Sequence, residues 1–285
     1  MADASGVVIL FVRDMTQRSV KARLAHYLAV WGCFSTGIVY FAIGVVAMLS
    51  FLKLKDGGAD EASLLVYLNN YIAGKFVVWV VMLGMIAYIV WRVYETFNDP
   101  YGYGSSAKGI AKRTGVALSG FADALIAFSA VQALLGIGET VETGVPVAER
   151  KMAETLLNES WGTAVVAAIG VACVVTALVQ IGYAAARSYE ERMNLEKMPR
   201  WTLVAVHVLA WTGHFARGVI LGIIGVSFIS AAVSTSAQHV VNTDKAFDFI
   251  GDNIGHFSFI AVAVCTVFYG LFMFAFGFYH DPDKD

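Results

Sequence analysis

The chain has 285 residues, of which 58% are hydrophobic and 15% are Asp, Glu, Lys or Arg. Soluble domains contain about 45–50% apolar and about 25% charged residues, so this composition excludes an ordinary soluble protein and predicts a membrane protein surrounded by lipid. The formal net charge is -2 and the sequence has no basic patch or stripe, so we expect no nucleic-acid partner.

Residues 1–23 form an N-terminal segment with one short apolar run, Val7–Val12. No basic residue precedes this run, and four follow it: Arg13, Arg18, Lys21 and Arg23. A secretory signal has the opposite order, with its basic residues before a longer apolar stretch. We therefore expect this segment to stay on the protein and in the cytoplasm.

Six apolar runs are long enough to cross a membrane, which takes about 20 residues of helix. They lie at about residues 26–50, 74–97, 114–137, 161–187, 203–232 and 255–279. Their interiors contain no proline, as continuous helices require. The sequence thus predicts an all-α polytopic membrane protein with six transmembrane helices, in which residues 1–285 form a single membrane domain.

Lysine and arginine are unevenly distributed among the connections. They concentrate in the N-terminal segment, in the second connection (Lys108, Lys112 and Arg113, with Arg92 near its start) and in the fourth (Arg187, Arg192, Lys197 and Arg200). Basic residues favour the cytoplasmic side. This bias predicts that both termini lie in the cytoplasm.

The odd-numbered spans repeat a pattern of small residues at three positions. The aligned sets are Gly32, Gly115 and Gly213; Gly37, Gly120 and Gly218; and Gly44, Ala127 and Gly225. The even-numbered spans also align, with Tyr88, Thr176 and Tyr269 at one position. The chain therefore contains three two-helix repeats at about residues 24–97, 109–187 and 203–280.

Each repeat crosses the membrane twice, so the three copies point the same way and are related by an axis along the membrane normal. A pseudo-threefold bundle is the simplest arrangement, although a side-by-side row also satisfies the repeat. In lipid, helices approach most closely where their residues are small. We therefore expect the repeated glycines to lie at helix contacts.

The segment Gly213–Leu221 resembles the first helix of a bacterial membrane family catalogued as domain of unknown function 1206, whose members carry tandem two-helix repeats. A tyrosine is common near the last position of this helix, and Tyr40 in the first repeat fits. The resemblance covers most of the chain. It implies a multi-pass topology in the bacterial inner membrane, and it implies no particular activity.

The middle repeat departs from this pattern, with Ser119 at the position of Arg217 and Asp123 at the position of Tyr40. A charge at the membrane centre costs about 2.5–3.5 kcal/mol, so Asp123 and Arg217 are candidate functional residues. Two interpretations stay open: an ion pair that clamps two repeats together, or a proton or cation site at Asp123. The register puts Arg217 near the cytoplasmic interface, where its side chain could reach water.

Several polar side chains within the spans are candidates to line a pathway: Gln132, Thr176, Gln180 and His214. His207 lies on the same helix face as His214, and His26 holds the equivalent position in the first repeat. Such histidines could bind haem or a metal. Nothing in their spacing is distinctive of such a site, so we expect no cofactor.

The fifth connection carries acidic residues and a histidine at four-residue intervals: Asp244, Asp248, Asp252 and His256. On one helix these aspartates would repel one another unless a cation were bound. Gly251 and Gly255 instead favour a segment that is not one regular helix, because glycine weakens a helix interior by about 1 kcal/mol. The group is a candidate metal site, to which no metal is assigned.

No Ser-His-Asp, Cys-His or paired-carboxylate set falls in one compartment at one depth, so we do not expect an enzyme. The sequence favours a non-enzymatic accessory, scaffold or interaction module of the inner membrane, with protein partners or a homo-oligomer. The first alternative is a small transporter or pore along the repeat axis, with Asp123 as its proton or cation site. A haem or redox protein is the second alternative.

Overall fold

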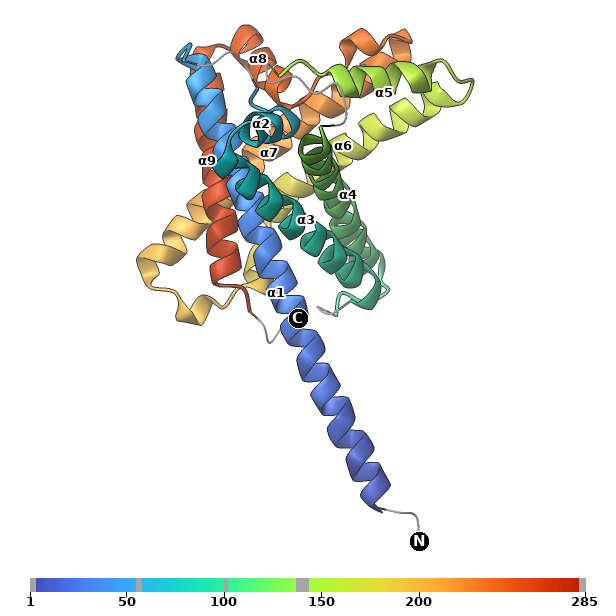
Figure 1. Ribbon diagram of the computed structural model, residues 1–285, viewed down its shortest axis with the longest axis vertical. Helices are drawn as coiled ribbons and strands as arrows, with labels where there is room; N and C mark the ends of the chain where they lie inside the picture. The colour runs from blue at the N-terminus through green and yellow to red at the C-terminus, as the bar shows by residue number, and fades with distance from the viewer. Residues whose placement is uncertain (1–3, 55–57, 100–101, 137–143, 282–285) are drawn as a thin grey trace.

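The computed structural model describes residues 4–54, 58–99, 102–136 and 144–281, except for the side chains of residues 4–25 and of several residues in the fourth helix. The chain is helical throughout these ranges and forms no strand in them (Figure 1). The α-helices are α1 Ala4–Phe51, α2 Glu61–Asn69, α3 Ile72–Asn98, α4 Ala107–Leu135, α5 Val147–Leu157, α6 Gly162–Ala185, α7 Arg200–Ser234, α8 Thr243–Asn253 and α9 His256–Phe278. Three short 3-10 helices are η1 Ser188–Arg192, η2 Leu195–Lys197 and η3 Ala237–His239.

Five of the helices are long and apolar enough to cross a membrane: α3, α6, α7, α9 and the part of α1 from His26 to Phe51. Their ends agree with the predicted spans to within a few residues. The prediction of membrane helices is therefore confirmed for these five. The helix at the position of the third predicted span, α4, begins with the basic residues Lys108, Lys112 and Arg113 and is not among the five found in the described residues.

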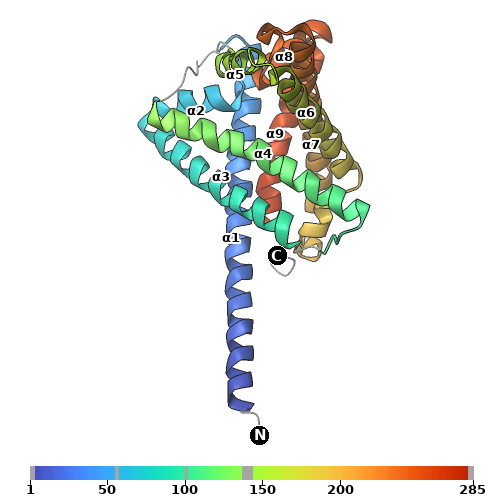
Figure 2. The ribbon, with the colours of Figure 1, turned by 90° about the vertical axis from the view of Figure 1, so that its right-hand side faces the viewer.

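Helix α1 extends farther than the sequence predicts. It starts at Ala4 and runs without a break into its membrane-crossing part. In Figures 1 and 2 its first half projects from one end of the helix bundle as a single straight rod. The N-terminal segment is thus a continuation of the first membrane helix, although its basic side chains lie outside the described residues.

The helices pack in a consistent order around the bundle. Helix α3 packs on α4, α6 packs on α7, and α9 packs on α1, so each of these pairs joins one repeat to the next. Within the first and third repeats, α1 also packs on α3 and α7 on α9. Helices α4 and α6 of the middle repeat share only a small contact. The two helices of the predicted middle repeat are therefore less closely packed on each other than those of the other two predicted repeats.

Three short helices, α2, α5 and α8, cover the end of the bundle opposite the projecting part of α1 (Figures 1 and 2). The sequence did not predict them. They precede α3, α6 and α9, respectively. Two of them begin with a side-chain cap: Asp60 accepts a hydrogen bond from the N–H of Ser63 (3.0 Å), and Asn242 accepts one from the N–H of Lys245 (3.1 Å). Such caps satisfy backbone N–H groups that have no partner within the helix.

Helix α8 holds three of the four residues of the candidate metal group. Asp244, Asp248 and Asp252 lie on this regular helix, but it ends at Asn253 and His256 begins α9, so the four residues are not on one regular helix, as predicted. The repulsion between the first two is reduced by Lys245, whose Nζ lies 2.7 Å from Oδ2 of Asp248 and 3.9 Å from Oδ2 of Asp244. Gly255, with φ 118°, then turns the chain from α8 into α9.

Candidate functional site

A cavity of about 320 Å³, the main cavity, opens between α3, α4, α6, α7 and α9, beside η1. Its volume lies within the range of small-molecule sites. The lining residues are Tyr88, Arg92, Tyr103, Lys108, Lys112, Gly115, Val116, Thr176, Val179, Gln180, Gly182, Tyr183, Ser188, Glu191, Arg192, His214, Tyr269, Phe272, Met273 and Phe276. The main cavity therefore combines a charged mouth with an aromatic and apolar interior.

Positions that the predicted repeat register aligns meet in the main cavity. Tyr88, Thr176 and Tyr269, which the repeat register aligns, all line it. Four residues farther along the same helices stand Arg92, Gln180 and Met273, and these also line it. Helices α3, α6 and α9 therefore present the same face to the main cavity.

An ionic group, the Glu95 cluster, lies beside the main cavity and is formed by Glu95 with the lining residues Arg92 and Arg192. The carboxylate of Glu95 is 2% exposed and contacts both guanidinium groups, with Nη1 of Arg92 at 3.1 Å and Nη2 of Arg192 closer. Arg92 also donates to the hydroxyl of Tyr88, and Arg192 donates to that of Tyr103 at 3.0 Å. One buried carboxylate is thus shared by two guanidinium groups, that of the buried Arg192 and that of Arg92, whose side chain is 14% exposed.

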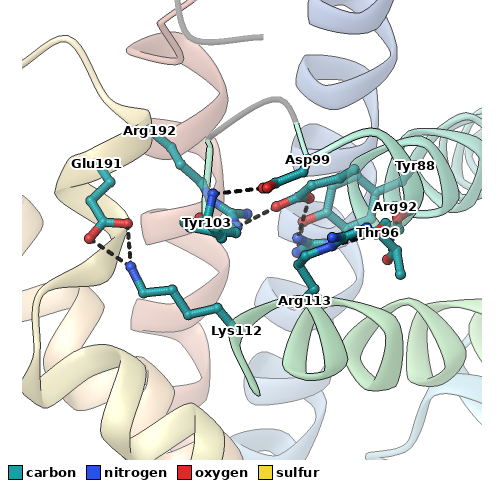
Figure 3. Close-up of polar contacts among 10 residues, drawn as sticks. Tyr88, Arg92, Thr96, Asp99, Tyr103, Lys112, Arg113, Glu191 and Arg192 are labelled. Carbon is teal, nitrogen blue, oxygen red and sulfur yellow. Dashed lines mark hydrogen bonds and ion pairs between the residues drawn. The ribbon is translucent and has the colours of Figure 1, made fainter. Parts of the chain in front are cut away.

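A second set of contacts forms the rim above this cluster. The carboxylate of Asp99 accepts hydrogen bonds from the backbone N–H groups of Tyr103 (2.8 Å) and Gly104 (2.7 Å), and these bonds hold the pKa of Asp99 below its usual range. Lys112 at the start of α4 pairs with Glu191 of η1 at 3.0 Å (Figure 3). These contacts hold Tyr103 and Gly104 to the end of α3, and they join α4 to η1.

His214 lies on the α6–α7 side of the main cavity and is 5% exposed. Its Nδ1 is 2.6 Å from the side-chain oxygen of Gln180. An amide oxygen only accepts, so Nδ1 carries the proton and Nε2 is left as an acceptor. Among the described residues, Nε2 has no hydrogen-bond partner. The rings of Tyr183, Tyr269 and Phe272 pack edge-on around the imidazole, with centroids 5.1–5.3 Å away.

Arg217 is also buried, with 5% exposure, so the expectation that its side chain reaches water at the interface is wrong. Its guanidinium carbon lies 4.8 Å from the ring centre of Tyr40 and 5.0 Å from that of Tyr269, and it donates to the Tyr269 hydroxyl. Cation–π contacts of this kind become stronger away from water. The guanidinium is held by two aromatic rings contributed by the first and third repeats.

These residues also line a small cavity of about 20 Å³, which is room for little more than one water molecule. Glu61 and Thr243 close the side of the small cavity that faces α2 and α8, and the Thr243 hydroxyl donates to Glu61 at 3.0 Å. Tyr269 lines both the small cavity and the main cavity. Tyr269 is therefore shared by the walls of the two spaces.

The candidate pathway residues divide between two places. Thr176, Gln180 and His214 come together in the main cavity, whereas Gln132 on α4 is not among its lining residues. The side chain of Asp123 lies outside the described residues, so its pairing with Arg217 and its role as a proton or cation site stay predictions.

The other histidines have separate partners. Nδ1 of His207 lies 2.8 Å from the hydroxyl of Tyr189, and the ring of His26 stacks on that of His280 with centroids 5.4 Å apart. Across the described part of the chain, no three His, Cys, Asp or Glu side chains converge as a metal site would need. For the candidate group on α8, the reason is that Asp244 and Asp248 make other contacts and His256 begins the next helix.

Sequence reasoning missed the Glu95 cluster as a site. Arg92 and Arg192 entered the prediction only as indicators of orientation, and Glu95 did not enter it. A usable signal was present, because Arg92 aligns with Gln180 in the repeat register and lies three residues before Glu95, the spacing of an intrahelical ion pair. The fold brings Arg192 to this pair from the fourth connection.

Several carboxylates lie at the end of the bundle that is covered by α2, α5 and α8. Asp244 is 3% exposed and accepts a hydrogen bond from the N–H of Ala59 at 2.7 Å. Burial raises the pKa of Asp244 to about 6 and that of the half-buried Glu149 to about 6, and it also raises the pKa of Asp60. Two carboxyl groups of this acidic end, those of Asp244 and Glu149, therefore titrate near pH 6.

We expect the protein to become more stable when the pH falls from 7.5 to 5. A carboxyl with a higher pKa in the folded chain binds its proton more tightly there. It therefore adds stability below its unfolded pKa and loses this contribution as the pH rises through the folded value. For Asp244 the gain at pH 5 is on the order of 1 kcal/mol, or a few degrees in melting temperature.

Thermal unfolding at the two pH values would measure this gain. The control is Asp244→Asn, which imitates the protonated carboxyl and should unfold with a smaller dependence on pH. An identical pH dependence in the variant would contradict the assignment to Asp244.

Two segments of the chain, residues 31–99 and 212–280, match the sequence model of a family described as Domain of Unknown Function (DUF1206). They fall within the first and third repeats, so the resemblance inferred from the residues is confirmed. The middle repeat lies outside both matches. Its departures from the repeated pattern and the looser packing of its two helices thus coincide.

A protein of Bacillus subtilis (strain 168), described as the uncharacterised protein YxxB, is 23% identical over 274 residues, which cover 94% of this chain and 97% of that protein. The similarity therefore runs through all three repeats. No solved structure matches the chain.

Proposed function

We propose that this protein, which carries two copies of the DUF1206 domain, is a non-enzymatic integral membrane protein that binds a small solute in the main cavity and passes it across the membrane. The observation that carries the proposal is the lining of the main cavity by equivalent positions of three repeats: Tyr88, Thr176 and Tyr269, then Arg92, Gln180 and Met273. A space lined in this way would lie on the axis that relates the repeats. Such an axis is where a transporter of repeated architecture binds its substrate.

The proposed architecture is six membrane helices in a pseudo-threefold ring. Its support is the cyclic pairing of α3 with α4, α6 with α7 and α9 with α1, because the third pair joins the end of the chain to its beginning. A row of three repeats would leave α1 and α9 at opposite ends. Helix α4 is the sixth membrane helix of this proposal.

Passage of a solute is favoured over simple storage by the position of Tyr269. Tyr269 lines both the main cavity and the small cavity, and its hydroxyl accepts a hydrogen bond from Arg217. Movement of these two side chains would connect the spaces. The accessory or scaffold role, with protein partners or a homo-oligomer, stays a prediction.

The basic mouth of the main cavity would face the cytoplasm of a bacterium, with both termini on that side of the inner membrane. The support is the distribution of lysine and arginine, since basic residues favour the cytoplasmic side. The acidic end formed by α2, α5 and α8 would then face outward.

Cysteine labelling would test whether solutes enter the main cavity. In a background with Cys33, Cys173 and Cys265 replaced by alanine, Thr176→Cys should react with a water-soluble, membrane-impermeant thiol reagent, because Thr176 lines the main cavity. The matched control is the next residue, Ala177→Cys. Both side chains are buried, but Ala177 is not among the lining residues of the main cavity, so it should stay unmodified.

The side from which labelling occurs would test the orientation. Reagent applied to inverted membrane vesicles should modify Thr176→Cys, and reagent applied outside intact cells should not. Equal protection of the Thr176→Cys and Ala177→Cys variants from both sides would overturn the proposal of a solute-accessible cavity.

A further inference from the structure

The charged side chains in the lining of the main cavity are mostly basic. Four are cationic (Arg92, Arg192, Lys108 and Lys112), and one is anionic, Glu191. Glu95 behind the wall adds a second negative charge, which the two arginines share. The excess is therefore positive on the side formed by α3, α4 and η1. A partly dehydrated positive site favours an anion, above all one that accepts hydrogen bonds from guanidinium groups.

The α6–α7 side carries no charged residue in the lining and offers a different polar group. Nε2 of His214 is buried and has no hydrogen-bond partner among the described residues, while Nδ1 is held by Gln180. Buried acceptors without partners are rare in native proteins. Because Nε2 can only accept in this tautomer, the group that completes it must be a hydrogen-bond donor.

Between the two sides the lining is apolar and aromatic, including Val116, Phe272, Met273 and Phe276. A fitting molecule therefore has an acidic group, an apolar body and a separate donor. Water could satisfy Nε2, but it would not account for the positive side. A hydroxylated organic acid satisfies all three features in one molecule.

We propose that the main cavity binds a hydroxylated organic anion, whose acidic group lies beside Arg92 and Arg192 and whose hydroxyl donates a hydrogen bond to Nε2 of His214. This inference rests on the proposed function, because it names the class of solute that the main cavity takes.

Three probes of similar shape separate the two interactions. 4-Hydroxyphenylacetate has both groups, 4-methylphenylacetate lacks the donor, and 4-hydroxyphenethyl alcohol lacks the charge. Binding to the full chain in lipid nanodiscs would be measured by titration calorimetry. We expect the hydroxy acid to bind roughly 2- to 10-fold more tightly than the methyl acid, and about 10-fold or more tightly than the neutral alcohol.

Two variants assign these preferences to residues. His214→Phe keeps a ring in place and should abolish the preference for hydroxyl over methyl, while the preference for the acid remains. Arg92→Gln should reduce the preference for the acid and keep that for the hydroxyl. Glu95 retains Arg192 as its partner in the Arg92→Gln variant, so folding should persist. Lys112→Gln, which removes the partly exposed pair with Glu191, is a milder way to reduce the positive charge of the main cavity.

Equal affinity of wild type for the two acids would overturn the role of His214, and equal affinity for acid and alcohol would overturn the anionic class. If no probe binds while Thr176→Cys is labelled, the ligand class is wrong and the proposed function stands. Failure of Thr176→Cys to react would instead remove the proposed function itself.

Discussion

Glu95→Gln is expected to lower the free energy of unfolding by about 3–5 kcal/mol, the usual cost of leaving a buried charge without its partner. Glu95 is 2% exposed and contacts the guanidinium groups of Arg92 and Arg192. Glutamine keeps the size of the side chain but removes the charge, so the buried Arg192 and the partly buried Arg92 are left next to each other without a carboxylate between them. Denaturant or thermal unfolding in one detergent would measure the loss.

The control is Glu191→Gln, which breaks the pair with Lys112 nearby. That pair is partly exposed, with 32% and 48% of the two side chains accessible, so its loss should cost less than about 1 kcal/mol. Should Glu95→Gln fail to fold, the double variant with Arg192→Gln should recover folding, because only one cation remains. Equal losses from the two single glutamate variants would show that the Glu95 cluster is not a buried ionic group.

Gly225→Ala is expected to destabilise the contact between α6 and α7 by about 1–3 kcal/mol, the usual cost of overpacking. A Cβ atom on Gly225 would lie 2.7 Å from Cγ2 of Val174 and 2.8 Å from the carbonyl oxygen of Gly170. Backbone atoms form part of this contact, so a rotamer change cannot relieve it. The two helices would have to separate.

The matched control is Gly222→Ala, three residues earlier on the same helix. A Cβ atom there would meet nothing nearer than Cβ of Ala177 at 3.9 Å. Alanine should therefore be neutral or stabilise the helix by up to about 1 kcal/mol. Melting temperatures of both variants in the same detergent would measure the difference, and a stable Gly225→Ala protein would contradict the close contact.

Gly44 shows why these contacts could be anticipated from the repeat. A Cβ atom on Gly44 would meet Val267 and the carbonyl oxygen of Ala263 on α9, as one on Gly225 meets Val174 and Gly170 on α6. Small residues recur in the sequence because equivalent helix pairs approach closely at equivalent heights. The partner helix was not predictable, because α1 meets α9 from the far end of the chain.

The candidate site was predictable in part. Thr176, Gln180 and His214 are polar residues in long apolar helices, and this contrast marked them in the sequence. The basic side of the main cavity was not predictable, because Arg92 and Arg192 lie near helix ends, where charged residues are common and usually solvated. Arg192 reaches Glu95 across 97 positions only because the fold brings the end of η1 beside the end of α3.

By itself, the amino-acid sequence determined the membrane helices and the repeat, since hydropathy over about 20 residues and recurring glycines are local properties of the chain. Tertiary structure alone decided that Arg217 lies between Tyr40 and Tyr269, that Glu95 holds two arginines, and that Nε2 of His214 has no partner among the described residues. These facts depend on which faces of distant helices meet, and a side chain's surroundings, not its identity, set its burial and its partners.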